Sequence, residues 1–283
     1  MAHTLLDIFR LTSDYLAGHG SESPRLDAEL LAAHALGLRR IDLYLQFDRV
    51  LTGAEVGEIR ELVRRRGGGE PIAYVTGARD FYSRRFTVTP AVLIPRPETE
   101  TLVQCALEVA RERGVTSIAD LGTGSGCVAV TLALELPGAH VVAVDASQDA
   151  LAVARGNAET YGVADRVTFV RGSWADALTS PVQLVVSNPP YVTSSELDGV
   201  ARDIREHEPR EALDGGADGL DAYRSLVSSL RSALAAEASV VLEVDPRRAA
   251  AVVALLCERF PAATTRVADD LARTARVVVA RVA

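Results

Sequence analysis

The sequence predicts an α/β protein, in which a doubly wound sheet of seven strands follows a small helical bundle and a β-hairpin. Three observations predict this fold. From Val115 onward, apolar runs of strand length alternate with helical patterns, which is typical of a parallel sheet with helices on both faces. A glycine-rich turn follows the first of these runs. The last two runs, Thr264–Val267 and Arg276–Val282, have no helix between them, so the two are antiparallel to each other and the final strand is reversed.

The composition describes a globular protein with more than one folded region. The chain has 283 residues, of which 48% are hydrophobic, enough for a sizeable core. We divide it into a bundle at 1–70, a linker at 71–97 and a sheet domain at 98–283. No apolar run reaches the length of a membrane span, and the N-terminus lacks the basic start and cleavage site of a signal peptide. The three cysteines are far apart, so we expect no disulfide framework and no metal site, and a cytoplasmic location.

The charge distribution argues against a protein that grips long nucleic acids. The net charge is −8, and all 30 basic residues are arginines. Residues 1–85 hold 12 arginines and 12 acidic residues, so the negative charge lies in the remainder of the chain. Neither part is the basic body that phosphate contacts require. This balance favours a protein or a small molecule as substrate.

The first 70 residues predict helices. Apolar residues recur at helical spacing from Leu5 to Leu16, and Pro24 stands where a second helix begins. Thr52 followed by Glu55 predicts an N-cap with a capping box. The run Arg64–Arg66 is interpreted as a solvated helix C-terminus, with phosphate binding as the alternative. The glycines that follow it predict a flexible joint.

Residues 71–94 predict a β-hairpin that links the two domains. Apolar residues alternate there with polar ones: Phe81, Phe86, Val88, Val92 and Ile94. The proline-rich stretch after Ile94 stiffens the entry to a helix at Thr99–Arg113. Arg96 and Glu98 have two interpretations, as capping and ion-pairing residues or as a border of the substrate site.

The sheet domain is then assigned in chain order. The predicted strands are Ser117–Leu121, Val141–Val144, Val167–Val170, Leu184–Val186, Ser239–Val244 and the two final runs. The predicted helices are Cys127–Glu135, Ser147–Tyr161, Leu220–Ala236 and Arg247–Phe260.

Three features at successive strand ends predict one nucleoside-binding crevice. The loop Gly122–Gly126 lets backbone approach a ligand, and its Gly-x-Gly-x-Gly spacing departs from the dehydrogenase fingerprint. Asp145 ends the next strand, where a carboxylate can accept from both hydroxyls of a ribose. Trp174 follows the third strand, where an indole can flank an adenine. Each has a structural alternative: a common βα turn, a helix N-cap and a core residue.

The stretch Ser187–Tyr191 ends the fourth strand, and its two prolines form a rigid turn. The Asn188 amide, the Pro189 carbonyl and the Tyr191 ring then form a docking site for a planar group that carries an NH2. The alternative is a Pro-Pro turn with Tyr191 packed on it. No lysine is present for a phosphate-binding P-loop, and no Cys or His lies near this strand to act as a nucleophile. A cofactor that carries its own electrophile fits this arrangement.

These motifs together resemble class I S-adenosylmethionine-dependent methyltransferases, whose Asn-Pro-Pro-Tyr form belongs to enzymes that methylate planar NH2 groups. The stretches Val92–Glu100 and Glu208–Gly216 further resemble the release factor glutamine methyltransferase family (PrmC/HemK), and the resemblance covers nearly the whole chain. It implies a Rossmann-like domain and methyl transfer from S-adenosyl-L-methionine, with S-adenosyl-L-homocysteine as product. The acceptor implied is the side-chain amide of the glutamine in the Gly-Gly-Gln motif of peptide chain release factors.

The resemblance also implies roles for individual residues. Asp145 is expected to hold the ribose, Trp174 the adenine, and Tyr191 to pack on the substrate amide. Ser173 departs from the family, which often has an acidic residue there, and Asp176 is a candidate substitute. The methionine part of the cofactor is expected to contact the loop formed by Gly122, Thr123, Gly124, Ser125 and Gly126. Asn188 and Pro189 are expected to accept the two amide hydrogens, and Pro190 belongs to the same catalytic turn.

Other substrates and another class of protein remain as alternatives. Glutamine methylation of a ribosomal protein would share every catalytic residue, whereas adenine methylation of nucleic acid needs a basic recognition surface. A cofactor-binding protein without turnover has no use for an amide clamp. We expect the bundle to dock the release factor, and we expect a monomer that binds neither nucleic acid nor membrane.

Overall fold

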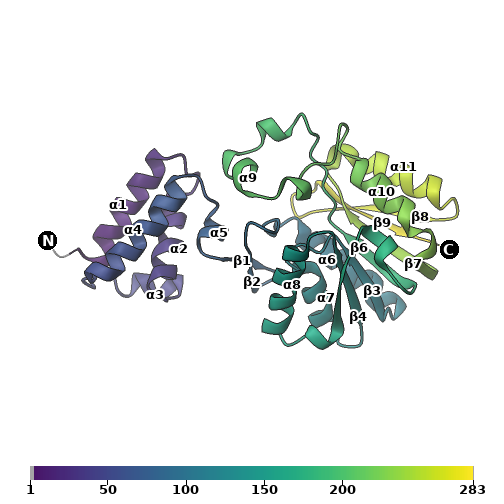
Figure 1. Ribbon diagram of the computed structural model, residues 1–283, viewed down its shortest axis with the longest axis horizontal. Coiled ribbons are helices and arrows are strands. Elements are labelled where there is room, and N and C mark those ends of the chain that lie inside the picture. Colours follow the sequence, from purple (N-terminus) through teal and green to yellow (C-terminus); the bar gives the residue numbers. More distant parts are fainter. Residues whose placement is uncertain (1–2, 283) are drawn as a thin grey trace. The chain divides into compact units, whose positions relative to one another are not determined.

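The computed structural model describes residues 3–282, which form two compact units (Figure 1). The first unit runs to Ala78 and also includes Ala201–His207, and the second comprises Arg79–Val200 and the described residues from Glu208 onward. The division at Ala78 falls within the segment expected to be a linker. No sequence pattern indicated that the short segment Ala201–His207, which lies between the fourth and fifth strands of the large sheet, belongs with the N-terminal helices.

The first unit is helical, as predicted. Its core is an apolar cluster that includes Leu5, Leu43 and Ile59. The predicted capping box is confirmed, because the Thr52 side chain accepts from the Glu55 amide and the Glu55 side chain accepts from the Thr52 amide. Its helices are α1 (Leu5–Gly18), α2 (Pro24–Ala35), α3 (Arg40–Tyr44), α4 (Gly53–Gly67), α5 (Ile72–Val75) and α9 (Arg202–His207).

The arginine run at the end of α4 is only partly solvated. Arg64 is exposed and pairs with Glu61, but the Arg66 side chain is 14% exposed and its Nε lies 2.7 Å from an oxygen of buried Asp27. The prediction of a solvated run is wrong for Arg66, because a buried carboxylate on α2 needs a cation beside it. Arg65 also pairs with a carboxylate, that of Glu70. Phosphate binding by the run therefore has no support.

The hairpin is shorter than predicted. It consists of β1 (Ala78–Phe81) and β2 (Arg84–Thr87), joined by two residues with φ of 50° and 59°, as in a tight type I′ turn. The prediction of extended structure is wrong before Ala78, where α5 lies, and after Thr87. Val88, Val92 and Ile94 are buried without belonging to a strand, because burial under a loop produces the same alternation as a ladder.

The second unit contains a seven-stranded sheet in the order β5-β4-β3-β6-β7-β9-β8. The first five strands in this order are parallel, and β9 is antiparallel to both β7 and β8. The predicted doubly wound sheet with an antiparallel final strand is thus confirmed. The strands are β3 (Ser117–Leu121), β4 (His140–Asp145), β5 (Val167–Arg171), β6 (Val182–Ser187), β7 (Leu234–Glu243), β8 (Thr264–Asp269) and β9 (Ala275–Arg281).

Helices cover both faces of this sheet (Figure 1). One apolar cluster joins the sheet to α6 (Thr99–Arg113), α7 (Cys127–Glu135) and α8 (Gln148–Thr160). A second cluster, on the opposite face, joins it to α10 (Asp221–Ser229) and α11 (Ala249–Arg259).

One predicted helix is too long. The expected helix Leu220–Ala236 ends as an α-helix at Ser229, and β7 already begins at Leu234. The Val182 amide donates to the Ala233 carbonyl at 2.8 Å, and Val182 lies opposite Leu234 in the ladder. Pairing with β6 therefore outweighs the helical preference of the alanines.

The connectivity places a crevice at the centre of the sheet. From β3 the chain continues outward through β4 and β5, and then returns to β6 on the other side of β3. Ligands of doubly wound proteins bind at such a switch point, beyond the carboxyl ends of the strands. The predicted motifs after β3 and β6 both lie at this point.

Candidate active site

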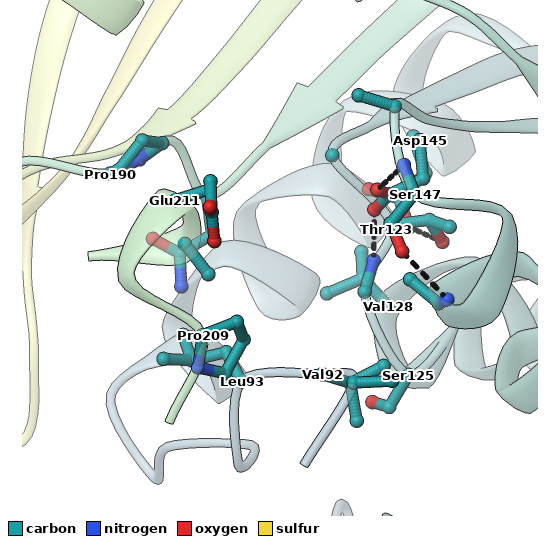
Figure 2. Close-up of a pocket in the computed structure, with 18 of the residues that line it drawn as sticks. Val92, Leu93, Thr123, Ser125, Val128, Asp145, Ser147, Pro190, Pro209 and Glu211 are labelled. Atoms are coloured by element: carbon teal, nitrogen blue, oxygen red, sulfur yellow. Dashed lines mark hydrogen bonds between the residues drawn. The ribbon is translucent and has the colours of Figure 1, made fainter. Parts of the chain in front are cut away.

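A cavity of about 640 Å³ opens at this switch point, within the second unit (Figure 2). Its walls come from the loops that follow β3, β4, β5 and β6, from the segment before α6, and from residues after Glu208. In Figure 2, Thr123, Asp145 and Ser147 gather on one side of the cavity, and Pro190 and Glu211 lie on the other. The volume is in the range of cavities that enclose nucleoside-sized ligands.

The glycine loop after β3 presents backbone to the cavity. Gly122, Gly124 and Gly126 have φ of 76°, 55° and 77°, a left-handed conformation that residues with a Cβ rarely adopt. The first two line the cavity with Thr123 and Ser125, but Gly126 does not. A Cβ at Gly126 would lie 2.9 Å from that of Ala154 on α8. Gly126, the residue before α7, therefore permits close packing of α7 against α8.

The Asp145 carboxylate lies at the cavity wall and is held from two sides. Its Oδ2 accepts from the Gly124 amide and its Oδ1 from the Ser147 amide, both at 2.9 Å. The N-cap of α8 is Ser147, whose Oγ accepts from the Ala150 amide, so the interpretation of Asp145 as the cap is wrong. A carboxylate offers about four lone-pair sites, and two hydrogen bonds leave capacity for the hydroxyls of a ligand.

Asp120, the first residue of the Asp120–Gly126 motif, is a buried carboxyl to which the sequence analysis assigned no role. It is 2% exposed, lines the cavity, and accepts from the Thr123 hydroxyl at 2.7 Å and the Ala129 amide at 3.1 Å. Burial raises its pKa to about 7, although these two hydrogen bonds act in the opposite direction. The signal in the sequence was an acidic residue inside an apolar strand, just before the glycine loop.

Trp174 serves both as cavity wall and as part of the core. Its ring carbon Cζ3 lies 3.6 Å from the position of a Cβ on Gly122, and it also packs against the apolar cluster beside α10. Its φ of 46° is unusual for a residue other than glycine. Ser173 lines the cavity beside it, whereas Asp176 does not.

The turn after β6 contributes Asn188 and Pro190 to the cavity, while Pro189 and Tyr191 lie outside its lining. The Asn188 Nδ2 donates to the Thr99 hydroxyl oxygen at 3.2 Å. Among residues 3–282, no group donates to its Oδ1. Tyr191 instead lines a shallower cavity of about 420 Å³ with Glu196. Burial raises the pKa of Tyr191 to about 12.

The two stretches beside the turn meet through an ion pair. Arg96 Nη2 lies 2.5 Å from Glu208, whose side chain is 1% exposed, and the Ile94 amide also donates to Glu208. The ion-pairing interpretation of Arg96 is confirmed, and Arg96 borders the cavity as well. A Cβ at Gly215 would lie 2.8 Å from the Pro190 carbonyl oxygen. Both stretches therefore shape the wall around Asn188.

Sequence comparisons agree with this geometry. The profile of the PrmC N-terminal domain matches residues 7–77, and that of the methyltransferase small domain matches residues 98–217. The release factor glutamine methyltransferase of Bradyrhizobium diazoefficiens is 43% identical, covering 92% of this chain and 89% of its own. The chain belongs to the release factor glutamine methyltransferase family. The enzyme of that name from Nitratidesulfovibrio vulgaris is 39% identical over 98% of this chain and 95% of its own length.

Solved structures support the methyltransferase fold. The ribosomal protein L11 methylase from Lactobacillus delbrueckii aligns with a TM-score of 0.50 and 19% identity, covering 66% of this chain and 81% of that one. A 16S rRNA methyltransferase from T. thermophilus, in complex with AdoMet and guanosine, aligns with a TM-score of 0.52 and 20% identity, covering 73% and 50%. No helix within the described part of this family member is long and apolar enough to cross a membrane.

Proposed function

We propose that this protein transfers a methyl group from S-adenosyl-L-methionine to the side-chain amide nitrogen of the glutamine in the Gly-Gly-Gln motif of peptide chain release factors. The observation that carries the proposal is the Asn188 carboxamide. Its Nδ2 is bound to Thr99 and its Oδ1 has no donor from the described chain. Asn188 Oδ1 is thus a free acceptor, and Asn188 lines the cavity of a methyltransferase-family protein. Such an acceptor suits a substrate that carries an NH2 group.

The cavity fits the proposed cofactor. Glycines in the left-handed conformation give a backbone cradle for its methionine part, beside buried Asp120. Asp145 keeps lone pairs for the ribose hydroxyls, and the Trp174 ring offers an apolar wall for the adenine. The bound cofactor would supply an electrophilic methyl group. The product would be S-adenosyl-L-homocysteine.

Asn188 would orient the substrate amide, and Pro189 would accept its second hydrogen through the backbone carbonyl. An amide nitrogen is a weak nucleophile because its lone pair is delocalised into the carbonyl. Two acceptors on the NH2 group fix the direction of the nitrogen and favour the positive charge that develops there. No covalent intermediate with the enzyme is needed. The roles of Pro189, Pro190 and Tyr191 toward the substrate stay predictions.

The proposed partner is therefore a protein, and we propose that the helical first unit helps to dock it. The test is methyl transfer from labelled cofactor to four substrates: a release factor, its Gln-to-Ala variant, a ribosomal protein and DNA. We expect label on the release factor alone, and none after the Gln-to-Ala change. Label that survives this change would contradict the proposed acceptor. Faster labelling of the ribosomal protein or of DNA would show that this molecule, and not the release factor, is the preferred substrate.

A further inference from the structure

The buried side chain of Asn157, near the end of α8, bonds to two separate segments of the second unit. Asn157 is 1% exposed. Its Nδ2 donates to the Ser125 carbonyl at 2.8 Å and to the Thr87 carbonyl at 3.0 Å, and its Oδ1 accepts from the Thr87 amide at 2.8 Å. Ser125 belongs to the glycine loop, and Thr87 is the last residue of β2. One carboxamide therefore joins α8, the hairpin and the glycine loop.

The partners of Asn157 fix the direction of its carboxamide. Thr87 presents both an amide hydrogen and a carbonyl oxygen, whereas the Ser125 carbonyl only accepts. A reversed carboxamide would bring its NH2 group against the Thr87 amide hydrogen and its oxygen against the Ser125 carbonyl. In the observed direction both Nδ2 hydrogens and the Oδ1 atom are bonded. An aspartate has the same shape but, when ionised, lacks the two donors.

The Ser125 carbonyl depends on Asn157 because its usual helical donor is engaged elsewhere. In a regular first turn of α7 the Ala129 amide would donate to this carbonyl. The Ala129 amide instead donates to the Asp120 carboxyl at 3.1 Å, as at a capped helix N-terminus. Within residues 3–282 the Ser125 carbonyl accepts from Asn157 alone. Ser125 is 2% exposed, and a buried carbonyl without a donor is destabilising.

The glycine loop requires such fixed points because glycine restricts the backbone less than any other residue. The first half of the loop is held by β4, whose backbone accepts from the Gly122 amide and whose final carboxylate accepts from the Gly124 amide. The second half is held at Ser125 by Asn157. Loss of the Asn157 carboxamide therefore frees the half of the loop that leads into α7.

The chain that follows Thr87 forms another part of the cavity lining, through Ala91, Val92 and Leu93. Val92 from this segment and Ser125 from the loop both border the cavity (Figure 2). Because the Thr87 amide and carbonyl both bond to Asn157, the end of β2 cannot shift without breaking these bonds. Asn157 thus holds the starting points of two parts of the lining.

We propose that Asn157 is a positioning residue for the cofactor, because its carboxamide holds the Ser125 end of the glycine loop and the end of β2 in fixed places. This inference rests on the proposed use of S-adenosyl-L-methionine. Asn157 does not line the cavity, so it acts through the loop and not by touching the ligand. Its loss should raise the Kd for the cofactor, with a smaller effect on kcat once the cofactor is saturating.

Tyr161 offers a matched control, because it also attaches the end of α8 to β2. It stands one helical turn after Asn157, and its hydroxyl donates to the Arg85 carbonyl at 2.8 Å. Arg85 and Thr87 are alternate residues of β2, so both present their carbonyls at the same edge of the strand. Within residues 3–282 the Tyr161 hydroxyl has no hydrogen bond to the glycine loop. Tyr161→Phe therefore weakens the attachment of the hairpin alone.

The first test is calorimetry of S-adenosyl-L-methionine binding to full-length variants, at a temperature at which circular dichroism shows each one folded. Asn157→Leu removes all three hydrogen bonds without adding a charge, and we expect its Kd to rise about 10-fold or more. Asn157→Asp, which keeps only the acceptor, should show a similar rise. Tyr161→Phe should bind within about twofold of the wild type, although its melting temperature falls.

Steady-state rates with the substrate that the wild-type enzyme labels separate binding from turnover. For Asn157→Leu the KM for the cofactor should rise with the Kd, while kcat stays within about threefold of the wild type. A loss confined to kcat, with KM and Kd unchanged, would overturn the proposed role.

Hydrogen exchange of the wild-type protein gives a second test, which does not depend on whether a variant folds. A cofactor that fixes the glycine loop should also fix the Asn157 carboxamide, and should slow exchange of the Thr87 amide about 5-fold or more. The control is the Asp270 amide, which donates to the Thr274 carbonyl in the turn between β8 and β9 and lies outside the cavity lining. Its exchange rate should not change.

The inference and the proposed function fail in different ways. An equal Kd for the wild type and Asn157→Leu, an equal rise in Kd for Tyr161→Phe, or a Thr87 exchange rate that the cofactor does not change would each overturn the inference. Labelling of the release factor would leave the function standing in each case. A wild-type protein that binds the cofactor but labels no release factor would end the proposed function, and a raised Kd for Asn157→Leu would still support the inference. A wild-type protein that binds no S-adenosyl-L-methionine would overturn both.

Discussion

Two buried carboxyl groups at the carboxyl edge of the sheet are alike in several respects, yet they differ in what they can reach. Asp120 and Glu243 are both almost fully buried, and burial raises the pKa of both to about 7. Asp120 lines the cavity, and one of its oxygens accepts two hydrogen bonds. Glu243 is outside the lining, and one of its oxygens has no partner in the described structure.

This difference separates a group that can meet a ligand from one that is enclosed by the protein. Asp120 lies beside the glycine loop and can contact a bound cofactor directly. Glu243 lies outside the cavity lining, at the end of the strand that pairs with β6. Substitution of Asp120 should therefore change binding, whereas substitution of Glu243 should change stability.

The largest effect should come from Asn188, which lines the cavity. Asn188→Ala removes the acceptor that orients the substrate NH2, and we expect kcat to fall about 1,000-fold. Calorimetry should show little change in the Kd for the cofactor. A parallel loss of cofactor affinity would contradict the proposal that Asn188 orients the substrate amide and does not hold the cofactor.

Asp120→Asn should have the next largest effect, on binding. A buried carboxylate beside the methionine part of the cofactor would pair with its ammonium group, and losing a charged hydrogen bond costs about 1.5–3 kcal/mol, or roughly 10- to 100-fold in Kd. Because the pKa of Asp120 is raised to about 7, wild-type affinity should increase as the pH rises through this value. Titration calorimetry at pH 6 and pH 8 measures both effects. A Kd that neither the substitution nor the pH changes would remove Asp120 from the site.

Glu243→Gln should change the pH dependence of stability. The pKa of Glu243 is raised from 4.5 to about 7 in the folded protein, so the folded state binds more protons than the unfolded state between these values. Its contribution to stability is therefore present at low pH and is lost as the pH rises through about 7. The shift corresponds to about 3 kcal/mol. Urea unfolding at pH 5 and pH 8 should show a smaller difference in the free energy of unfolding for the variant, and an unchanged difference would contradict the buried, titrating carboxyl.

The smallest effect should come from Asp176→Asn. Asp176 is exposed and does not line the cavity, so the Kd for the cofactor should stay within about twofold, the range typical of surface substitutions. A tenfold or greater loss of affinity for the cofactor would instead support Asp176 as the substitute for the acidic residue that the family often has at the position of Ser173.

The sheet and the main residues that line the cavity were predictable from the sequence, because both follow local patterns. Asp145 ends one apolar strand and Asn188 directly follows another, and the order of the strands brings such ends together. The errors arose where a distant partner decides the structure. The alanines of β7 extend along β6, and Arg66 is buried because Asp27 lies on another helix.

The hydrogen bond between Asn188 and Thr99 could not be predicted in this way. Thr99 begins a helix, and Asn188 directly follows a parallel strand. No spacing in the sequence connects them, because their contact depends on how α6 packs against β6.

The most direct test of the central claim is to locate the transferred methyl group. A release factor is incubated with the wild-type enzyme and S-adenosyl-L-methionine, and its peptides are fragmented in a mass spectrometer. We predict one methyl group on the side-chain nitrogen of the glutamine in the Gly-Gly-Gln motif, and an unmodified protein when Asn188→Ala replaces the wild type. A methyl group on any other residue, or equal modification by Asn188→Ala, would contradict the assignment of this cavity to amide methylation.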